Sequence, residues 1–488
     1  MKKWKNTAVA LLSALCLLPG TDAAAADKEL EVENELEREL DSMIPCTEEF
    51  LFEDGDVVGF IGDSITHVEY TGVSYQEFIY NYYITRYPQW NLEFRNLGTS
   101  SYTAKDAVEL YRKEKGIQDA EIDGITKAVV MFGMNEALAG TSAGKYVKNI
   151  RELVELLNER GLENEDIILV APTPYDQTRS SNYTEDGKIR ETTDDLLSEY
   201  VPELKALAEE LGTHFVDLHT PMLWVTEIVQ GVIPDDTLTI TDNVHPNAMG
   251  NTLAGFFFLY QQGADKEVAA VHLTSDGNAE TEKAAVKGLK RKGDRYIRFK
   301  YQADSLPMAV SYEFFQATQY FEIIDEISRE YLQVDGLKSS VNYSVYMNHY
   351  MIGEYSGKEL KEGINLTNCD LSPRQAAAKE IEVLNQQWQL VSAEYRAQVR
   401  KAAKHEISQE ELDAAYREWQ GETEAIRNEM YEIARENASK TYTVEIVSED
   451  YHVWMGHEVW QWIAGAFAVL LAGCAGGCLI YRTKKGRK

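Results

Sequence analysis

A serine, a histidine and an aspartate have the types and the order that a nucleophile with its base requires. Ser64 ends the stretch Gly62-Asp63-Ser64, which follows the apolar run 57–61 and precedes a helical pattern from about Ser74. This pattern predicts a buried strand and a tight turn at the carboxyl end of a sheet, where open α/β folds place their sites. A serine there is a nucleophile only if a base lies near it, and an ordinary strand-to-helix loop would use the same residues.

A candidate base stands in the loop before the last helix of the predicted α/β region. Asp242 and His245 are three residues apart, so both side chains can reach one site. His245 would take the proton from Ser64, and Asp242 would orient the imidazole and stabilise its charged form. Pro246 favours an extended backbone at His245, which suits a fixed loop. We therefore predict Ser64, Asp242 and His245 as the catalytic residues.

Two further stretches follow predicted strands and could supply hydrogen-bond donors. Gly98 follows one strand, and a glycine there lets the backbone amide approach a substrate oxygen. Asn135, within Gly133-Met134-Asn135-Glu136, follows another strand and carries an amide side chain. The backbone amides of Ser64 and Gly98 and the side chain of Asn135 are predicted to form an oxyanion hole. Each stretch alone would also fit a plain turn.

The segments between these stretches alternate as a parallel sheet covered by helices requires. We expect strands at Val57–Ile61, Leu92–Asn96, Ala128–Phe132, Ile167–Ala171 and His214–Leu218. We expect helices at Tyr75–Tyr87, Ala104–Lys115, Ala143–Arg160, Asp194–Leu211 and Leu253–Gln262, with a long loop after the fifth strand. Because parallel strands end at one edge of a sheet, this arrangement would gather the predicted site residues there.

The pattern changes twice after residue 264. Helical periodicity over 372–440 predicts two helices with N-caps at Ser372 and Ser408, which we interpret as an antiparallel pair with a spacer or packing role. Before them, aromatic and β-branched runs predict a β-rich accessory module over 265–371. Its expected strands are Val268–Leu273, Tyr296–Tyr301, Met308–Phe314, Val341–Tyr346 and Tyr350–Tyr355.

Both ends of the chain carry membrane-targeting patterns. Residues 1–26 combine lysines, a short apolar run and small residues, as a secretory signal peptide does. Residues 462–481 hold no formal charge, are long enough to span a bilayer, and precede the basic tail 482–488. We therefore expect an exported body and one transmembrane helix in the cell membrane, with the basic tail in the cytoplasm.

Two connecting segments complete this organisation. The strongly acidic residues 27–49 are interpreted as an exposed helical spacer that follows the signal peptide. Residues 441–461 are interpreted as a juxtamembrane segment between the helical pair and the transmembrane helix.

Composition narrows the class of protein further. The chain has 488 residues, too many for one compact core, and a net charge of −32. Removing the two basic ends leaves a more acidic body, and such a surface repels nucleic acid. Only Cys46 and Cys369 fall within the predicted body, where one disulfide or two unpaired thiols would fit equally well. The Cys and His residues lack zinc-site spacing.

Taken together, Gly62-Asp63-Ser64, Gly98, Gly133-x-Asn135 and Asp242-x-x-His245 resemble the four blocks of the SGNH (GDSL-type) serine hydrolases. The resemblance covers about Phe50–Gln262, less than half of the chain, and places the hydrolase domain at residues 50–264. It implies a three-layer α/β/α, flavodoxin-like esterase domain that needs no metal or organic cofactor. One departure is Glu136, where the family usually has Asp. Residues 335–366 are similar to an accessory region of some bacterial members.

Together with the targeting patterns at the two ends, the resemblance predicts an exported, membrane-anchored serine esterase that acts through an acyl-enzyme. Small acyl groups on carbohydrates are the substrate class it suggests. The same triad could instead transfer an acyl group to a cell-surface glycan. A non-catalytic surface module that binds a partner is a third hypothesis, and the complete set of triad residues argues against it.

Overall fold

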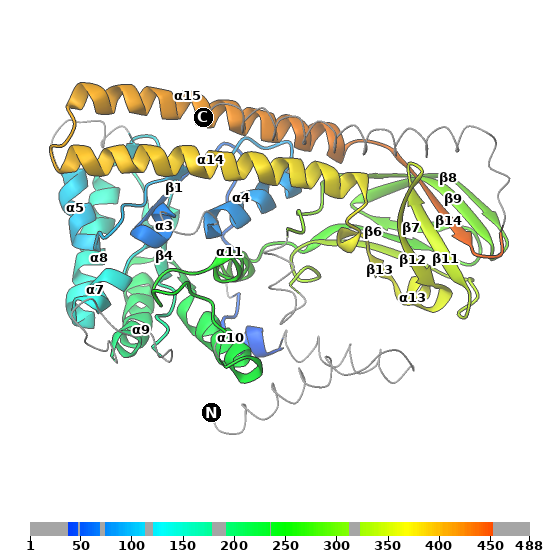
Figure 1. Ribbon diagram of the computed structural model, residues 1–488, viewed down its shortest axis with the longest axis horizontal. Coiled ribbons are helices and arrows are strands. Elements are labelled where there is room, and N and C mark those ends of the chain that lie inside the picture. The colour runs from blue at the N-terminus through cyan, green and yellow to red at the C-terminus, as the bar shows by residue number, and fades with distance from the viewer. Residues whose placement is uncertain are drawn as a thin grey trace, which may run out of the picture.

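The computed structural model describes residues 38–46, 49–68, 74–112, 121–177, 192–234, 236–311 and 323–451. The predicted signal peptide and transmembrane helix lie outside these ranges, and within them no helix is long and apolar enough to cross a membrane. An α/β domain and a β-rich module lie end to end, and two long helices run along one side of the molecule (Figure 1).

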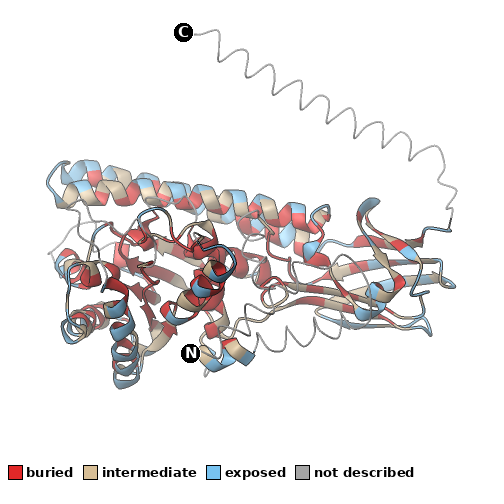
Figure 2. Cartoon of the chain, turned by 60° about the horizontal axis from the view of Figure 1, so that its bottom comes forward, coloured by how far each residue is buried: buried red, intermediate tan, exposed pale blue. Residues whose placement is uncertain are grey.

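The α/β domain is built on a parallel sheet with the flavodoxin-like strand order β2-β1-β3-β4-β5. All five predicted strands are confirmed to within two residues, and the buried strands lie between layers of helices (Figure 2). Their continuous apolar runs reflect burial on both faces. The strands are β1 (Val57–Gly62), β2 (Glu93–Asn96), β3 (Lys127–Met131), β4 (Ile167–Ala171) and β5 (His214–Asp217).

Helices cover both faces of this sheet. On one side α5, α8 and α9 pack next to one another, and on the other side α4 packs against α11. The expected long loop after β5 is wrong, because α10 begins directly after that strand. Met222, Val225 and Val229 recur at helical spacing and are buried, which explains this helix. The helices are α3 (Ser64–His67), α4 (Tyr75–Arg86), α5 (Ala104–Arg112), α7 (Met134–Leu138), α8 (Ala143–Glu159), α9 (Thr193–Leu211), α10 (His219–Val232) and α11 (Ala248–Gln262).

The β-rich module consists of a four-stranded sheet, β13-β10-β6-β7, and a five-stranded sheet, β12-β11-β14-β9-β8. The strand expected at Met308–Phe314 is absent from its described part, residues 308–311. There the Met308 amide donates to Ser328 Oγ and does not pair with a neighbouring strand. A short helix, α13 (Gly357–Glu362), follows β12. The strands are β6 (Glu267–Leu273), β7 (Ala279–Glu282), β8 (Ala284–Lys292), β9 (Tyr296–Ala303), β10 (Arg329–Val334), β11 (Asn342–Met347), β12 (Tyr350–Ser356), β13 (Ile364–Asn365) and β14 (Tyr442–Ser448).

Strand β14 changes the interpretation of the segment after the helical pair. It lies between β9 and β11 and pairs with both in antiparallel register. Tyr442, Val444 and Ile446 alternate along it and are buried in the core of the module. The first part of the expected juxtamembrane segment is therefore a central strand, while residues 452–461 lie outside the described residues.

The two predicted long helices are confirmed as α14 (Pro373–Ala403) and α15 (Gln409–Ala438). Both predicted N-caps are in place, and Ser408 forms a capping box with Glu411. The pair packs on the α/β domain, since Ile381, Trp388 and Met430 are buried in the same core as the sheet. The helical pair therefore has a packing role and does not act as a spacer.

The acidic segment also packs, in the part that the structure describes. Residues 38–43 are helical, and Leu40 and Ile44, one helical turn apart, are buried in the core of the α/β domain. Asp41 accepts a hydrogen bond from the Tyr260 hydroxyl at 2.6 Å. These residues are therefore anchored to the domain and are not an exposed spacer.

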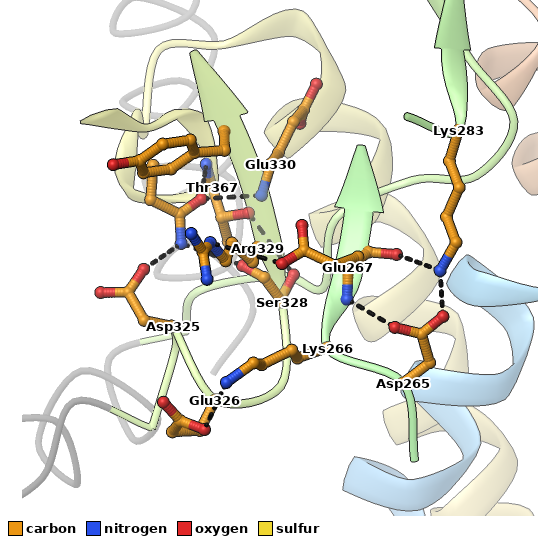
Figure 3. Close-up of polar contacts among 12 residues, drawn as sticks. Asp265, Lys266, Glu267, Lys283, Asp325, Glu326, Ser328, Arg329, Glu330 and Thr367 are labelled. Atoms are coloured by element: carbon orange, nitrogen blue, oxygen red, sulfur yellow. Dashed lines mark hydrogen bonds and ion pairs between the residues drawn. The ribbon is translucent and has the colours of Figure 1, made fainter. Parts of the chain in front are cut away.

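Polar contacts gather around the start of β6, where α11 leads into the β-rich module (Figure 3). Lys283 pairs with the Asp265 carboxylate, and Arg329 pairs with Glu267 at 3.4 Å. From the α/β side, Arg86 at the end of α4 donates to the carbonyl oxygen of Ile327 at 3.1 Å. These bonds tie both parts to one connecting region.

Candidate active site

Ser64 is presented by a tight turn between β1 and α3. The strand ends at Gly62, Asp63 is the N-cap residue, and Ser64 is the first residue of the helix. The Asp63 carboxylate accepts from the Ile65 amide at 2.9 Å, which satisfies one donor of the first turn. A side chain at position 62 would place its Cβ 2.1 Å from Thr66 Oγ1, so the turn requires glycine there.

The structure brings Ser64, His245 and Asp242 together in one hydrogen-bonded series. Ser64 Oγ lies 2.8 Å from His245 Nε2, and His245 Nδ1 lies 2.5 Å from Asp242 Oδ2. The Asp242 side chain also accepts from the backbone amides of Val244 and His245 at 2.9 and 3.0 Å. The imidazole is therefore held from the side opposite the serine.

The loop that carries Asp242 and His245 is fixed by its own backbone. The Ile240 amide donates to the carbonyl oxygen of His245 at 2.9 Å. Asn243 occupies the left-handed region at φ 65°, and its carbonyl oxygen accepts from the amide of Asp176, in the loop after β4, at 3.0 Å. Asn247 then caps α11 by accepting from the Gly250 amide at 2.9 Å. The end of β4 and the start of α11 thus both hold the histidine loop.

Three carboxyl groups near the serine have shifted pKa values. Burial would raise the pKa of Asp242, but its hydrogen bonds from His245 and Val244 outweigh burial and lower it. Burial raises the pKa of Asp63 from 3.8 to about 6. Burial raises the pKa of Glu136 from 4.5 to about 7, and the charge of Asp63 adds to the effect. Asp242 is therefore ionised beside the imidazole throughout the neutral pH range.

The loop that contains Gly98 lies against the nucleophile turn. The Thr99 amide donates to the carbonyl oxygen of Gly62 at 2.9 Å. A Cβ at position 98 would lie 2.3 Å from the backbone nitrogen of His67, so only glycine allows this approach. The Gly98 amide donates to Asn96 Oδ1 at 3.0 Å. It already has an acceptor in this structure, and its role as an oxyanion donor stays a prediction.

Asn135 joins the third loop to the second. Its side-chain nitrogen donates to the carbonyl oxygen of Tyr102 at 2.9 Å, and this nitrogen has a second proton to donate. The neighbouring Glu136 is buried, and its carboxylate accepts from the amide of Ala104, the first residue of α5, at 2.8 Å. The longer side chain at 136 thus links α7 to the start of α5.

Several residues that hold the site were given no role there by the sequence interpretation. Asn96 has no motif that would mark it, although it stands two residues before the predicted glycine. His67 stands three residues after Ser64, and its side chain bonds the Ser100 hydroxyl and the helical pair. Arg396 of α14 bonds the glycine loop across about 300 residues of sequence, and no local pattern could have found it.

The remaining histidines and cysteines of the α/β domain and its surroundings have structural environments. The His214 ring stacks on Phe50 with centroids 4.5 Å apart, and His219 Nε2 lies 3.1 Å from the buried carboxylate of Asp194. Cys46 and Cys369 are not joined by a disulfide. Cys369 is buried, and burial raises the pKa of its thiol to about 11.

Residues 60–253 match the GDSL-like lipase/acylhydrolase family. No curated protein matches the chain significantly. Among solved structures, a gut microbial diltiazem-metabolizing enzyme is 21% identical, with a TM-score of 0.69 over 82% of this chain and 99% of that chain. This likeness extends the shared fold beyond the α/β domain.

Two other solved structures each match less than half of this chain. An acetylxylan esterase from Geobacillus stearothermophilus is 21% identical, with a TM-score of 0.33 over 43% of this chain and 96% of that chain. An alpha/beta hydrolase enzyme from the metagenome of Lake Arreo, Spain, is 19% identical, with a TM-score of 0.34 over 43% and 97% of the two chains.

The fold and the family match define the class of protein as an SGNH-type ester hydrolase. The residues that match the GDSL-like lipase/acylhydrolase family, 60–253, make up about two-fifths of the chain.

Proposed function

We propose that Ser64, His245 and Asp242 are the catalytic triad of a serine esterase. Ser64 Oγ attacks the carbonyl carbon of an ester while His245 Nε2 takes its proton, and a tetrahedral oxyanion forms. The intermediate collapses, the imidazolium returns the proton to the leaving alcohol, and an acyl-serine remains. Water then repeats the sequence and releases the acid.

The observation that carries this proposal is the series of short contacts from Ser64 to His245 to Asp242. The 2.8 Å contact lets the imidazole accept the serine proton directly. The 2.5 Å contact on the other nitrogen fixes the ring and stabilises the imidazolium. His245 is mostly buried while Asp242 is about two-fifths exposed, so the ring itself is shielded from water.

The oxyanion hole is also part of the proposal. Its donors would be the Ser64 amide, the Gly98 amide and the second proton of the Asn135 side chain. When the oxyanion forms, the Gly98 amide would donate to both the oxyanion and Asn96 Oδ1, or it would give up its bond to Asn96. Such tightening in the transition state is what distinguishes catalytic donors from ground-state contacts.

The proposal also covers the substrate class and the cellular location of the protein. We propose small acyl groups on carbohydrates as substrates, on the resemblance to SGNH enzymes that act outside cells. We propose an exported body held in the cell membrane by residues 462–481, on the apolar run and the basic tail that follows it.

The test uses the full-length protein and its Ser64→Ala variant with p-nitrophenyl acetate, and an exposed Ser42→Ala variant as the control. We expect turnover and fluorophosphonate labelling in the wild type and in Ser42→Ala, and neither in Ser64→Ala. Acetylated oligosaccharides and p-nitrophenyl esters of longer acids would then define the substrate. Unchanged turnover in Ser64→Ala would remove this serine from the mechanism.

A further inference from the structure

Arg396 on α14 reaches the glycine loop of the active site from the helical pair. Its side chain is fully buried. Nε donates to the carbonyl oxygen of Gly98 at 3.0 Å, and Nη2 donates to Thr99 Oγ1 at 2.8 Å and to the carbonyl oxygen of Leu97 at 3.4 Å. One guanidinium group therefore holds three consecutive residues.

These bonds fix the two peptide planes that meet at Gly98. The Leu97 carbonyl belongs to the same planar unit as the Gly98 amide, so a bond to that oxygen sets the direction of the amide. The Gly98 carbonyl belongs to the same unit as the Thr99 amide, which donates to Gly62 two residues before Ser64. The backbone dihedral angles of a glycine vary more freely than those of other residues, so the bonds from Arg396 restrict the backbone where it has the most freedom.

The same face of α14 holds the nucleophile turn. Ala393 lies one turn before Arg396, and its carbonyl oxygen accepts from His67 Nε2 at 3.0 Å. A carbonyl can only accept, so Nε2 carries a proton. The other ring nitrogen, Nδ1, lies 2.6 Å from Ser100 Oγ. His67 thus connects α3, which begins with Ser64, to both the glycine loop and α14.

The face of α14 is itself held in place. Arg396 Nη1 pairs with the buried carboxylate of Glu121, which also accepts from the Tyr395 hydroxyl. Burial would lower the pKa of Arg396, but the charge of Glu121 outweighs it and raises the pKa above its ordinary value. From α15, Trp419 stacks on Tyr395 and donates to Ser392 Oγ at 3.2 Å. The second helix thus supports the face that touches the active site.

We propose that the α14–α15 pair is part of the catalytic unit, with Arg396 positioning the glycine loop and His67 positioning the nucleophile turn. The inference rests on the proposed esterase function and goes beyond it, since the α/β domain alone would lack the bonds from α14 to Gly98 and to His67. Neither residue touches the reacting atoms.

The chain contains a matched control for Arg396 on the same helix. Arg374 is equally buried and pairs with buried Glu330 at 2.7 Å, and Glu330 also accepts from the Tyr301 hydroxyl at 2.6 Å. This second arginine, carboxylate and tyrosine group is 22 residues away along α14, or about 33 Å. Glu330 lies among the contacts at the module junction (Figure 3). The control has the same chemistry but no bond to the glycine loop in the structure.

The experiment compares two charge-neutral double variants of the full-length protein, Arg396→Met/Glu121→Gln and Arg374→Met/Glu330→Gln. Replacing both partners avoids leaving one buried charge unpaired. Melting temperatures, kcat and KM are measured with p-nitrophenyl acetate well below the melting range. We expect kcat of the Arg396 double variant to fall by at least about 30-fold with little change in KM, as for a misplaced oxyanion donor. We expect the Arg374 double variant to stay within about threefold of wild type.

If the double variant does not fold, the single variant Arg396→Lys tests the positioning role of Arg396. Lysine keeps the positive charge beside Glu121 but cannot form the planar fork that holds Leu97, Gly98 and Thr99. We expect a folded protein with reduced kcat and slower fluorophosphonate labelling of Ser64.

Two results would overturn the proposals separately. If the wild type is active and the Arg396 variants keep the kcat of wild type, or lose no more than the Arg374 variant at equal stability, the positioning role is wrong and the esterase function stands. A wild type without ester turnover and without labelling would contradict the esterase function, and the positioning role with it.

Discussion

Asp242 binds His245 twice, with Oδ1 accepting from the backbone amide at 3.0 Å and Oδ2 facing the ring Nδ1 at 2.5 Å. This double contact predicts why Asp242→Asn should lose catalytic activity. The backbone amides of Val244 and His245 require an acceptor, so the asparagine carbonyl must take the place of Oδ1. Its NH₂ group then faces Nδ1, which must become an acceptor, and the ring proton moves to Nε2.

A His245 ring protonated at Nε2 cannot accept the proton of Ser64. We therefore expect Asp242→Asn to keep its melting temperature within a few degrees while kcat falls by about 10³- to 10⁴-fold. Asp236→Asn, in the same loop, controls for the loss of charge. Steady-state kinetics with one activated ester measures the effect, and an Asp242→Asn protein as active as wild type would contradict the triad.

Glu136→Gln should stabilise the protein in a pH-dependent way. The folded state raises the pKa of Glu136 from 4.5 to about 7, so the fold favours the protonated carboxyl. Ionisation of this carboxyl therefore does not lower the free energy of unfolding below about pH 4.5. The loss grows as the pH rises and reaches its full value above about pH 7. The glutamine side chain is neutral and can still accept from the Ala104 amide.

We expect the free energies of unfolding of Glu136→Gln and wild type to agree near pH 4.5. At pH 8 we expect the variant to be more stable by up to about 3 kcal/mol, the upper value that the full shift allows. Denaturant unfolding at several pH values measures this difference, with the exposed Glu109→Gln as the control. A difference that does not depend on pH would mean that folding leaves the pKa of Glu136 unchanged.

Removing β14 should destroy the β-rich module. The strand lies between β9 and β11, so its loss leaves two unpaired inner edges and uncovers a buried face of Val345 and Phe299. We expect a chain that ends at residue 451 to fold and a chain that ends at residue 441 to aggregate. Size-exclusion chromatography and thermal unfolding compare the two, and equal behaviour would show that β14 is dispensable.

Leu40→Ala tests whether the acidic segment is part of the fold. Leu40 is 2% exposed and packs in the core of the α/β domain, so its truncation should cost about 2–4 kcal/mol of stability. The exposed Ser42→Ala, two residues further on, should change stability by less than about 0.5 kcal/mol. Chemical denaturation of both variants is the measurement. A Leu40→Ala protein as stable as Ser42→Ala would restore the interpretation as an exposed spacer.

Local sequence determined the parts of the protein that depend on nearest neighbours. Continuous apolar runs identify strands such as Ile167–Ala171, because a parallel strand is buried on both faces. The caps at Ser372 and Ser408 identify the long helices, because an N-cap satisfies donors within its own first turn. The triad candidates follow from residue type and position at strand ends.

The tertiary structure alone decided what joins segments far apart in the chain. The alternation in Tyr442–Ser448 indicates a strand but not its partners, and β9 and β11 lie about 100 residues or more before it. Arg396 on a helix is, by sequence, an ordinary exposed charge. It becomes a buried support of Gly98 because α14 packs against the sheet edge, and Glu121 neutralises its charge there. Periodicity records which face of an element is buried, whereas the partner of that face is fixed only when the whole chain packs.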